Sequence, residues 1–374
     1  MKARYYCLLL LSFFYLSAQA QTPPDIGDES DESSGYFLVW SDEFDGTTLN
    51  TTDNWFHQTQ LPTPGGWFNG ELQHYTDAEA NSSVSNGNLS ITAIKETLVD
   101  QSLSRDYTSA RLNSKFAFTY GRVDVRAQLP PELGTWPAIW MLGTDIDEDG
   151  GFHDAGAGTT NGGTAWPAIG EIDILEQFAN KLEATSAIHT TQSSGDTQDK
   201  GATDLITATT DFHIYSIIWD ESTIQFLVDN QEYWTYDPVD KYGSLTAANW
   251  PFDSPQYLLL NVAMGGIGGT IDPNFTSASM DVDYVRVYQQ EASTVKLPLD
   301  FELASESYTF TTFGNSVFEV GVDPDNAGNS AMKMTRAAGT NWWSGGTVAL
   351  EETVDATTGT FSMDVYSNIA LDYV

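Results

Sequence analysis

The sequence has one cysteine and lacks any long apolar run. Cys7 is the only cysteine among 374 residues, and it lies in an N-terminal segment that we expect to be removed. The mature protein would then contain no disulfide, no thiolate metal site and no cysteine nucleophile. The apolar stretch 7–16 is too short to cross a bilayer, which takes ~20 apolar residues. We therefore expect no membrane span.

Basic residues are also scarce. The chain has 15 Lys and Arg against 52 Asp and Glu, a formal net charge of −37. Nucleic-acid binding depends on Lys and Arg contacts to phosphate, so this charge argues against a nucleic-acid partner. It also disfavours sulfated polysaccharides, although a local basic patch could override it. A neutral polymer is the partner most compatible with the charge, and we expect a monomer.

The N-terminus has the order of features typical of a secretory signal peptide. Lys2 and Arg4 precede the apolar stretch 7–16, and Ala18-Gln19-Ala20 follows it. We expect cleavage near Ala20 and secretion; the alternative is a buried N-terminal helix. Residues 21–35 are rich in Pro, Asp, Glu and Ser, which predicts a disordered acidic linker.

From Tyr36 the chain consists of short alternating runs separated by Gly, Asn, Asp and Pro. We expect strands at 88–94, 121–127, 214–219 and 280–288. Long helical periodicity is absent, which favours an all-β sandwich over 36–290. After a linker, residues 297–374 form a second β-rich block with expected strands at 308–312 and 360–366. Its end directly after a strand-like stretch leaves open that this block is incomplete. The block contains the pair Trp342-Trp343, and we expect at least one of these indoles to be exposed and to contact polysaccharide, which makes the block a candidate carbohydrate-binding module.

The segment Gly170-Glu-Ile-Asp-Ile-Leu-Glu176 carries the chemistry. On a regular strand Glu171 and Asp173 share a face, and Ile172 lies on the other. Glu176 would point to the wrong face unless a β-bulge at Ile174-Leu175 adds one residue. Neighbouring carboxyls raise each other's pKa, a cost tolerated where one must be ionised and another protonated. Retaining glycosidases need such a pair; the alternatives are a solvated acidic edge and a metal site.

Glu-Ile-Asp-Ile-Leu-Glu resembles the Glu-x-Asp-x-x-Glu signature of glycoside hydrolase family 16, in the bulged form of laminarinases and many agarases. The resemblance extends over most of 36–290, through the segments at 40–46, 107–112, 120–122, 136–142 and 283–288. It implies a β-jelly-roll sandwich with a cleft on its concave face. It also implies Glu171 as nucleophile, Glu176 as acid/base, and Asp173 between them as a hydrogen-bond partner of Glu171. The trio should titrate as one coupled unit.

Further site residues follow from the same resemblance. His189, on the next expected strand, resembles the family's active-site histidine. Trp136, Trp140 and Trp166 lie on or beside segments that line the cleft, and indole rings suit the apolar faces of sugars. One of Trp136 and Trp140 could belong to the core, whereas Trp166 is the best candidate for stacking beside the scissile bond. Sugar hydroxyls or strand-end hydrogen bonds would occupy three polar side chains: Asn69, Glu71 and Arg111.

Two regions are candidates for calcium. The resemblance implies a structural calcium on the convex side at positions matching Glu43, Gly87 and Asp283. Separately, 145–150 fits the first half of a calcium loop, but its twelfth position is Gly156 where a bidentate Glu is needed, so we interpret it as a solvated acidic loop. It opens an insertion, 145–165, that we expect to form one wall of the cleft and that could set endo against exo action.

Three functions are consistent with these features. The first is a retaining endo-β-1,3-glucanase of the laminarinase type. The second keeps the chemistry and changes the substrate to mixed-linkage glucan, agar or carrageenan, because the signature reports chemistry and the loops report substrate. The third is a non-catalytic β-glucan-binding protein on the same fold. The third normally requires loss of a catalytic carboxyl, and here all three are present.

Overall fold

The computed structural model describes residues 35–63, 65–153 and 162–290, together with the backbones of four strands beyond them. The chain divides into two compact units, Met1–Gln289 and Gln290–Val374. The expected signal peptide, nearly all of the acidic linker, the expected strand 360–366 and the pair Trp342-Trp343 lie outside the described residues. Within the described part, no helix combines the length and apolar character needed to cross a membrane.

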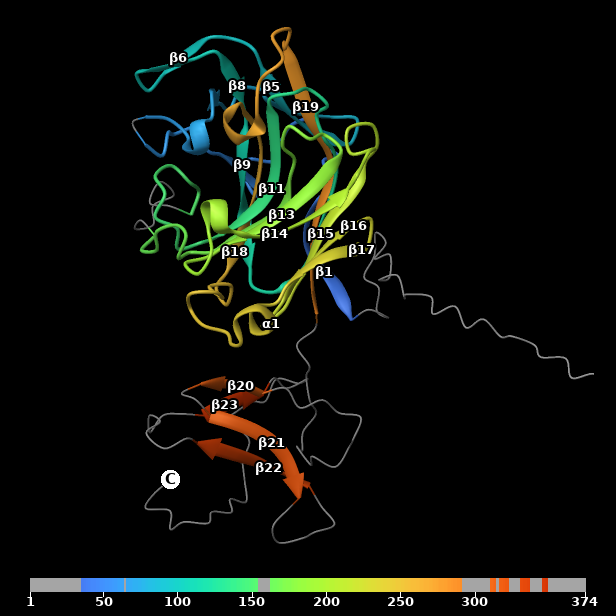
Figure 1. The fold of residues 1–374 in the computed structure, drawn as a ribbon. Helices are drawn as coiled ribbons and strands as arrows, with labels where there is room; N and C mark the ends of the chain where they lie inside the picture. The colour runs from blue at the N-terminus through green and yellow to red at the C-terminus, as the bar shows by residue number, and fades with distance from the viewer. Residues whose placement is uncertain are drawn as a thin grey trace, which may run out of the picture. The chain divides into compact units, whose positions relative to one another are not determined.

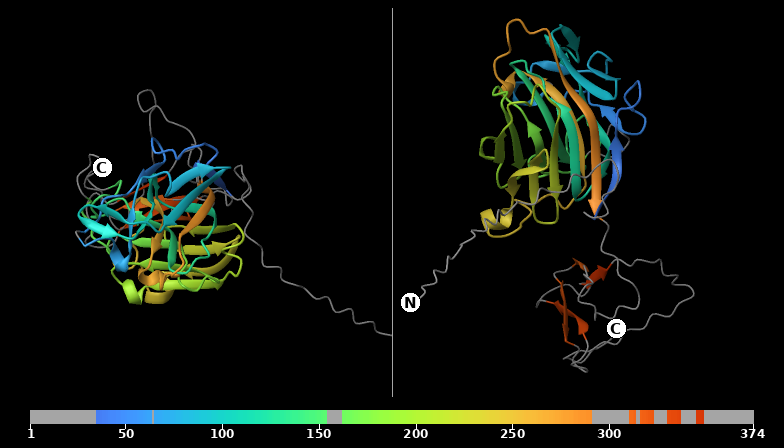
Figure 2. Two further views of the ribbon diagram at one scale, coloured as in Figure 1. Left: turned by 90° about the horizontal axis from the view of Figure 1, so that it is seen from above. Right: turned by 90° about the vertical axis from the view of Figure 1, so that its right-hand side faces the viewer.

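Two β-sheets pack face to face in the first unit (Figures 1 and 2). In sheet order, the ten-stranded sheet contains β17 (Gln231–Tyr236), β16 (Ile224–Val228), β15 (His213–Trp219), β10 (Gly121–Gln128), β19 (Ser277–Gln290), β5 (Asn88–Ile94), β8 (Tyr107–Ser109) and β3 (Gln73–Tyr75), with β1 (Tyr36–Asp42) on β19 and β4 (Ser82–Ser85) on β5. The seven-stranded sheet contains β14 (Asp199–Asp204), β13 (Glu183–His189), β12 (Glu171–Glu176), β11 (Thr135–Gly143), β18 (Gln256–Met264), β9 (Arg111–Phe118) and β2 (Trp55–His57). The all-β sandwich predicted from the sequence is confirmed.

Short elements connect these strands. They are the hairpin β6 (Leu98–Asp100) and β7 (Leu103–Arg105), the helix α1 (Pro238–Tyr242), and the 3-10 turns η1 (Phe68–Gly70), η3 (Gly195–Thr197) and η4 (Gly266–Gly268). In the second unit β20 (Phe310–Phe313) pairs with β23 (Gly345–Val348), and β21 (Ser316–Val322) pairs with β22 (Ser330–Arg336). The strand expected at 308–312 overlaps β20.

Apolar side chains from both sheets meet in one core. β5 alternates between buried and half-buried residues over the bounds that its sequence pattern predicts. β18 is buried along its whole length, because one side of it packs in the core between the sheets and a second, smaller apolar cluster covers Tyr257 and Leu259 on its other side. Large side chains such as Trp55 and Trp219 fill the space between the sheets. The core therefore covers the inner face of the seven-stranded sheet. The candidate site lies on the other face of this sheet, here called the open face.

Candidate active site

A β-bulge on β12 brings three carboxyl groups to the open face. Against β11, Ile139 pairs with Leu175 and the next residue, Trp140, pairs with Asp173, so Ile174 is the extra residue. The pairing of β12 with β13 shifts register at the same place. Ile172, Ile174 and Leu175 all belong to the core between the sheets. Glu176 therefore returns to the face of Glu171 and Asp173, as the sequence predicts.

The strand begins at a glycine that its surroundings require. Gly170 has φ +82°, a left-handed conformation that favours glycine. A Cβ at this position would lie 2.7 Å from atoms of Pro251 and Phe252. This close approach fixes the residue at which β12 starts, and therefore the position of Glu171 along the strand.

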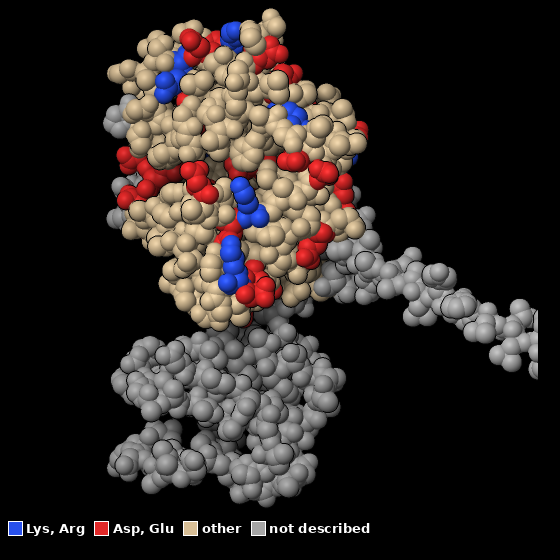
Figure 3. Space-filling model, viewed as in Figure 1, with Lys and Arg blue, Asp and Glu red and all other residues tan. Residues whose placement is uncertain are grey.

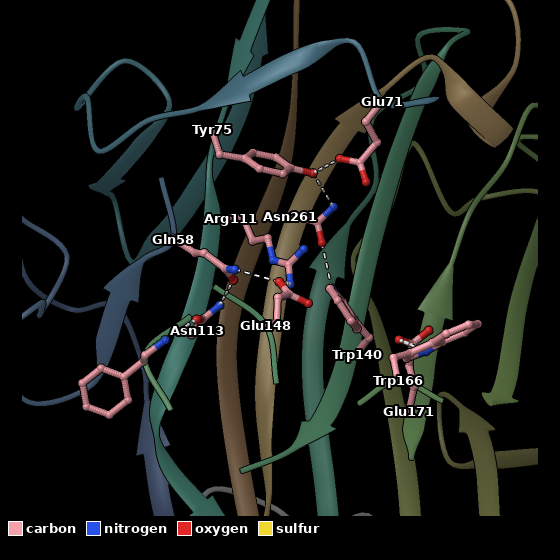
Figure 4. Close-up of polar contacts among 11 residues, drawn as sticks. Gln58, Glu71, Tyr75, Arg111, Asn113, Trp140, Glu148, Trp166, Glu171 and Asn261 are labelled. Carbon is pink, nitrogen blue, oxygen red and sulfur yellow. Dashed lines mark hydrogen bonds and ion pairs between the residues drawn. The ribbon is translucent and has the colours of Figure 1, made fainter. Parts of the chain in front are cut away.

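Glu171 accepts a hydrogen bond from an exposed indole and faces an imidazole. Trp166 Nε1 donates to Glu171 Oε2 at 3.1 Å, and this tryptophan is 45% exposed (Figure 4). His189 Nε2, from β13, lies 3.6 Å from Glu171 Oε1 and 3.2 Å from Asp173 Oδ2. The backbone N–H of Gly195 donates to His189 Nδ1 at 3.2 Å. Because Nδ1 accepts this bond, the proton of the neutral ring lies on Nε2, toward the carboxyl groups.

Glu176 is held by a buried indole at the other end of the trio. Trp136 Nε1 donates to Glu176 Oε1 at 2.9 Å, and Trp136 is only 7% exposed. Thr185 Oγ1 donates to the backbone carbonyl oxygen of Glu176 at 2.8 Å. Trp136 is thus packed as a core residue and still contributes its polar edge to the site.

Burial gives the trio unusual proton affinities. It raises the pKa of Asp173 to about 8, and burial together with the neighbouring Asp173 charge raises the pKa of Glu176 to about 8. The pKa of Glu171 rises well above its usual value, first through burial and then through Asp173, while His189 opposes the rise. Three carboxyl groups this close therefore share protons at neutral pH. Around Glu171 itself, the Trp166 N–H and His189 are the groups that favour a negative charge.

A chain of polar contacts extends from the trio across the sheet. Trp140 Nε1 donates to Asn261 Oδ1 at 2.8 Å, and Asn261 Nδ2 donates to the Tyr75 hydroxyl at 3.1 Å. Tyr75 in turn donates to Glu71 Oε2 at 2.9 Å, and the amide of Gln73 binds the same oxygen at 2.6 Å. Burial raises the pKa of Glu71. Figure 4 shows this chain beside Trp166 and Glu171.

The acidic loop reaches the same face through Glu148. Its Oε1 accepts from Arg111 Nη2 at 2.7 Å and from Gln58 Nε2 at 2.8 Å, and both charged side chains are at most one-tenth exposed. The Arg111 guanidinium also lies over the rings of Trp67 and Trp140, 5.2 and 4.8 Å from their centroids. Arg111 is therefore paired with a carboxylate and packed against two indole rings.

The interpretation of 145–150 as a solvated loop is wrong for part of it. Asp145, Asp147 and Asp149 are exposed, but Ile146 and the Glu148 side chain are buried. The Asp145 carboxylate, the first ligand of a calcium loop, instead accepts from the Gly163 N–H and the Thr164 hydroxyl at 3.0 and 2.7 Å. These bonds close the neck of the loop. The loop is a docked structure because alternate residues face inward.

The structure brings together most of the residues expected at the site. Asn69 lies apart from the network, exposed in η1 with φ +57°. Sequence reasoning missed five members of the network: Gln58, Gln73, Tyr75, Glu148 and Asn261. Only Asn261 leaves a signal, because it is the single amide in the otherwise apolar stretch 258–264. Figure 3 shows acidic side chains in a band across the middle of this face.

The strand register aligns five of these positions. Glu176 pairs with Ala138, Ala138 with Asn261, and Asn261 with Arg111. The Gln58 N–H then donates to the Arg111 carbonyl at 2.9 Å. The resulting row crosses β12, β11, β18, β9 and the end of β2. Its smallest member, Ala138, lies between Trp136 and Trp140 on the same strand, which leaves room above the sheet next to Glu176.

One group of side chains in the described residues could hold a metal ion by itself. Ligand atoms of Glu171, Asp173 and His189 all lie within 4.8 Å of one another. At the expected structural calcium site, the side chains have other partners. Arg286 binds both carboxylate oxygens of Glu43, at 2.9 and 2.8 Å, and Arg126 binds Asp283 Oδ2.

Known proteins resemble this chain in sequence and fold. Residues 69–286 match the family model "Glycosyl hydrolases family 16". A β-glucanase of Rhodothermus marinus is 39% identical over 273 residues, which cover 70% of this chain and 88% of the relative. A glucan endo-1,3-β-glucosidase A1 of Niallia circulans is 36% identical, with 72% of this chain and 41% of the relative covered.

The similarity extends to solved structures. LamA of Zobellia galactanivorans, solved in complex with laminaritriose and laminaritetraose, is 43% identical with a TM-score of 0.60, and the match covers 67% of this chain and 98% of that one. This match confirms the expected jelly-roll fold. The bulged trio, the family match and these relatives together assign the chain to glycoside hydrolase family 16, as an endo-β-glucanase of the laminarinase type that acts on a polysaccharide.

Proposed function

We propose that the protein is a retaining endo-β-1,3-glucanase in which Glu171 is the nucleophile and Glu176 the acid/base. The observation that carries the proposal is the bulge, because it puts both carboxyl groups on one face of one strand. The printed names of the relatives, a glucan endo-1,3-β-glucosidase and an enzyme solved with laminarin oligosaccharides, support β-1,3-glucan as the substrate.

The reaction has two displacements. In the first, a Glu171 oxygen bonds to the anomeric carbon while the glycosidic bond breaks, and the leaving oxygen takes the proton of Glu176. In the second, Glu176 accepts a proton from water, and the water oxygen replaces Glu171 on the anomeric carbon. A pKa of about 8 keeps Glu176 protonated at neutral pH, as the first step requires.

Asp173 and His189 would limit the change in net charge around Glu171 between the two steps. A pKa of about 8 lets Asp173 hold a proton at neutral pH, and in that state it adds no second negative charge beside Glu171; when Asp173 is ionised, its charge raises the pKa of Glu176. His189 presents Nε2–H to both carboxyl groups, since Gly195 occupies Nδ1. When Glu171 forms its bond to the sugar and loses its charge, the proton of Asp173 becomes easier to remove, and the trio stays balanced.

The mechanism is tested by the stereochemistry of the first product. Proton NMR of a fresh digest should show the β anomer before mutarotation, and initial formation of the α anomer would exclude Glu171 as nucleophile. Glu171→Gln should abolish hydrolysis without loss of the fold. Glu176→Ala should recover part of its activity with azide, a nucleophile that needs no general base.

The same chemistry on mixed-linkage glucan, agar or carrageenan is the second candidate. Initial rates on laminarin, lichenan and agarose decide between them. We expect laminarin to be the best substrate, and a clear preference for agarose would refute the β-1,3-glucan assignment.

We also propose a structural calcium at Glu43, Gly87 and Asp283. Support comes from the strand register: Val282, the neighbour of Asp283, pairs with Leu89, two residues after Gly87. β1 pairs with β19, and β1 ends at Asp42, directly before Glu43. With the Glu43 carboxylate bound to Arg286, the available donors are backbone carbonyls and Asp283 Oδ1. Such all-oxygen donors fit calcium. Calorimetric titration of chelator-treated protein with calcium tests it, and Asp283→Asn should weaken the binding.

We propose, too, that the protein is exported and its first residues removed near Ala20. The charged start, the apolar stretch and the Ala-Gln-Ala segment support this. N-terminal sequencing of the protein recovered from the medium or periplasm of an expressing cell tests it, and retention of Lys2 in exported material would refute cleavage.

A further inference from the structure

Two buried hydroxyl groups support the bulge from behind. Ser186, on β13, is 1% exposed and faces the core between the sheets. Its Oγ donates to the backbone carbonyl oxygen of Ile174, the extra residue of the bulge, at 2.7 Å. Because the serine proton is used there, Ser186 Oγ accepts the proton of the Tyr233 hydroxyl, which it contacts directly. Tyr233 lies on β17, in the opposite sheet.

This relay, the Ser186 and Tyr233 hydroxyls with the Ile174 carbonyl, puts polar groups in a core that apolar side chains could fill. Ile172, Ile174 and Leu175 belong to the apolar core against which the Tyr233 ring packs. Burying hydroxyl groups costs free energy unless each one is bonded, and among the described residues these two are bonded through each other and the bulge carbonyl. Burial raises the pKa of Tyr233 to about 12, so the phenol keeps the proton that it donates.

The relay lies where it can control the direction of the segment that carries Glu176. A bulge turns one carbonyl out of the regular pairing, and the direction of that carbonyl fixes the direction of the next residues. Ser186 holds the carbonyl of Ile174, two residues before Glu176, while Thr185 holds the carbonyl of Glu176 itself. Two neighbouring residues of β13 therefore fix the segment that carries Glu176, one from the core side and one from the open face.

We propose that Ser186 and Tyr233 are positioning residues for Glu176, which act by holding the bulge at Ile174. The inference rests on the proposed acid/base role of Glu176. Neither hydroxyl touches the substrate or the reacting atoms. Loss of the relay lets the bulge relax, and Glu176 moves away from the oxygen that it must protonate. A misplacement of about 1 Å can cost 10²-fold in rate.

The leaving group separates positioning from general damage. Laminarin needs a proton on its leaving oxygen, whereas a 2,4-dinitrophenyl β-glycoside of a laminarin oligosaccharide departs without one. We expect Ser186→Ala to lower kcat on laminarin by about 10- to 100-fold. Its rate of glycosyl-enzyme formation from the dinitrophenyl substrate, followed as a pre-steady-state burst, should change by less than about threefold. Tyr233→Phe should show the same pattern with a smaller loss, and Ser186→Thr should restore most of the activity.

A matched control and a reference variant complete the experiment. Ser216, on β15, is also 1% exposed, and its hydroxyl has no hydrogen-bond partner among the described residues. Ser216→Ala deletes an equally buried oxygen and should leave both rates unchanged. Glu176→Ala is the reference, since it must lose laminarin hydrolysis and keep the burst.

Each outcome has a separate meaning. If Glu176→Ala loses both activities equally, the proposed acid/base assignment fails. If Glu176→Ala behaves as expected but Ser186→Ala and Tyr233→Phe lose both activities equally, or lose neither, the positioning role is wrong. Should Ser186→Ala not fold, Tyr233→Phe decides by the same ratio of the two rates.

Discussion

Replacing Glu148 by Ala removes the carboxylate that neutralises a buried guanidinium. Arg111 is 4% exposed, and Glu148 Oε1 lies 2.7 Å from its Nη2. Removing one partner of a buried pair costs about 3–5 kcal/mol, because the other charge stays buried. Gln58 also loses its acceptor, worth about 1 kcal/mol. Relaxation of Arg111 toward solvent would offset part of this, so we expect the free energy of unfolding to fall by about 3 kcal/mol.

Urea denaturation followed by tryptophan fluorescence measures this loss at pH 7. Glu148→Gln keeps an oxygen for Arg111 and Gln58 and should lose about half as much, whereas Asp147→Ala, an exposed neighbour in the same loop, should change stability by less than about 0.5 kcal/mol. Added salt should not abolish the difference, since buried pairs are screened weakly. A loss below about 1 kcal/mol for Glu148→Ala would refute the buried pair and the docked loop with it.

Four further results are expected. Burial raises the pKa of Glu176 from 4.5 to about 8, so between these pH values the folded chain holds a proton that the unfolded chain has released, and stability falls as the pH rises. Glu176→Gln should remove at least about 1.4 kcal/mol of this fall, measured by urea denaturation at pH 5 and at pH 8. Trp166→Ala should raise KM on laminarin by about tenfold with little change in melting temperature, because Trp166 is 45% exposed; an unchanged KM would exclude its stacking role. A chelator should lower the melting temperature by a few degrees and leave kcat at 25 °C unchanged, whereas a lost kcat would point to a metal at the trio. Truncation after Gln290 should weaken action on insoluble glucan and spare soluble oligosaccharides, and equal activity on both would refute a binding role for the second unit.

The sequence determines the catalytic strand because its signals are local. Alternation puts Ile172 opposite Glu171 and Asp173, and the spacing to Glu176 demands one extra residue, which the structure supplies at Ile174. The sandwich follows from the same alternation repeated along the chain. These patterns are legible because a strand has a fixed period of two residues.

The supporting contacts could not be predicted, because they join distant segments. Gln58 and Glu148 are 90 residues apart, and Ser186 and Tyr233 are 47 residues apart. The local sequence around each of these side chains would look the same if the residue were an exposed polar residue with no partner. Glu148 is an example, since its acidic neighbours do face solvent and only the docking of the loop distinguishes it.

The aligned row from Glu176 to Gln58 has a consequence for how substrate preference can change. Neighbouring strands are about 4.8 Å apart, so Ala138 and Gln58 are separated by about 14 Å across three strand intervals. Substitutions at such distances, with no shared hydrogen-bond partner, combine additively, whereas those on adjacent strands do not. Variant libraries can therefore be screened separately at Ala138 and at Gln58, and only adjacent positions, such as Asn261 with Arg111, need to be randomised together.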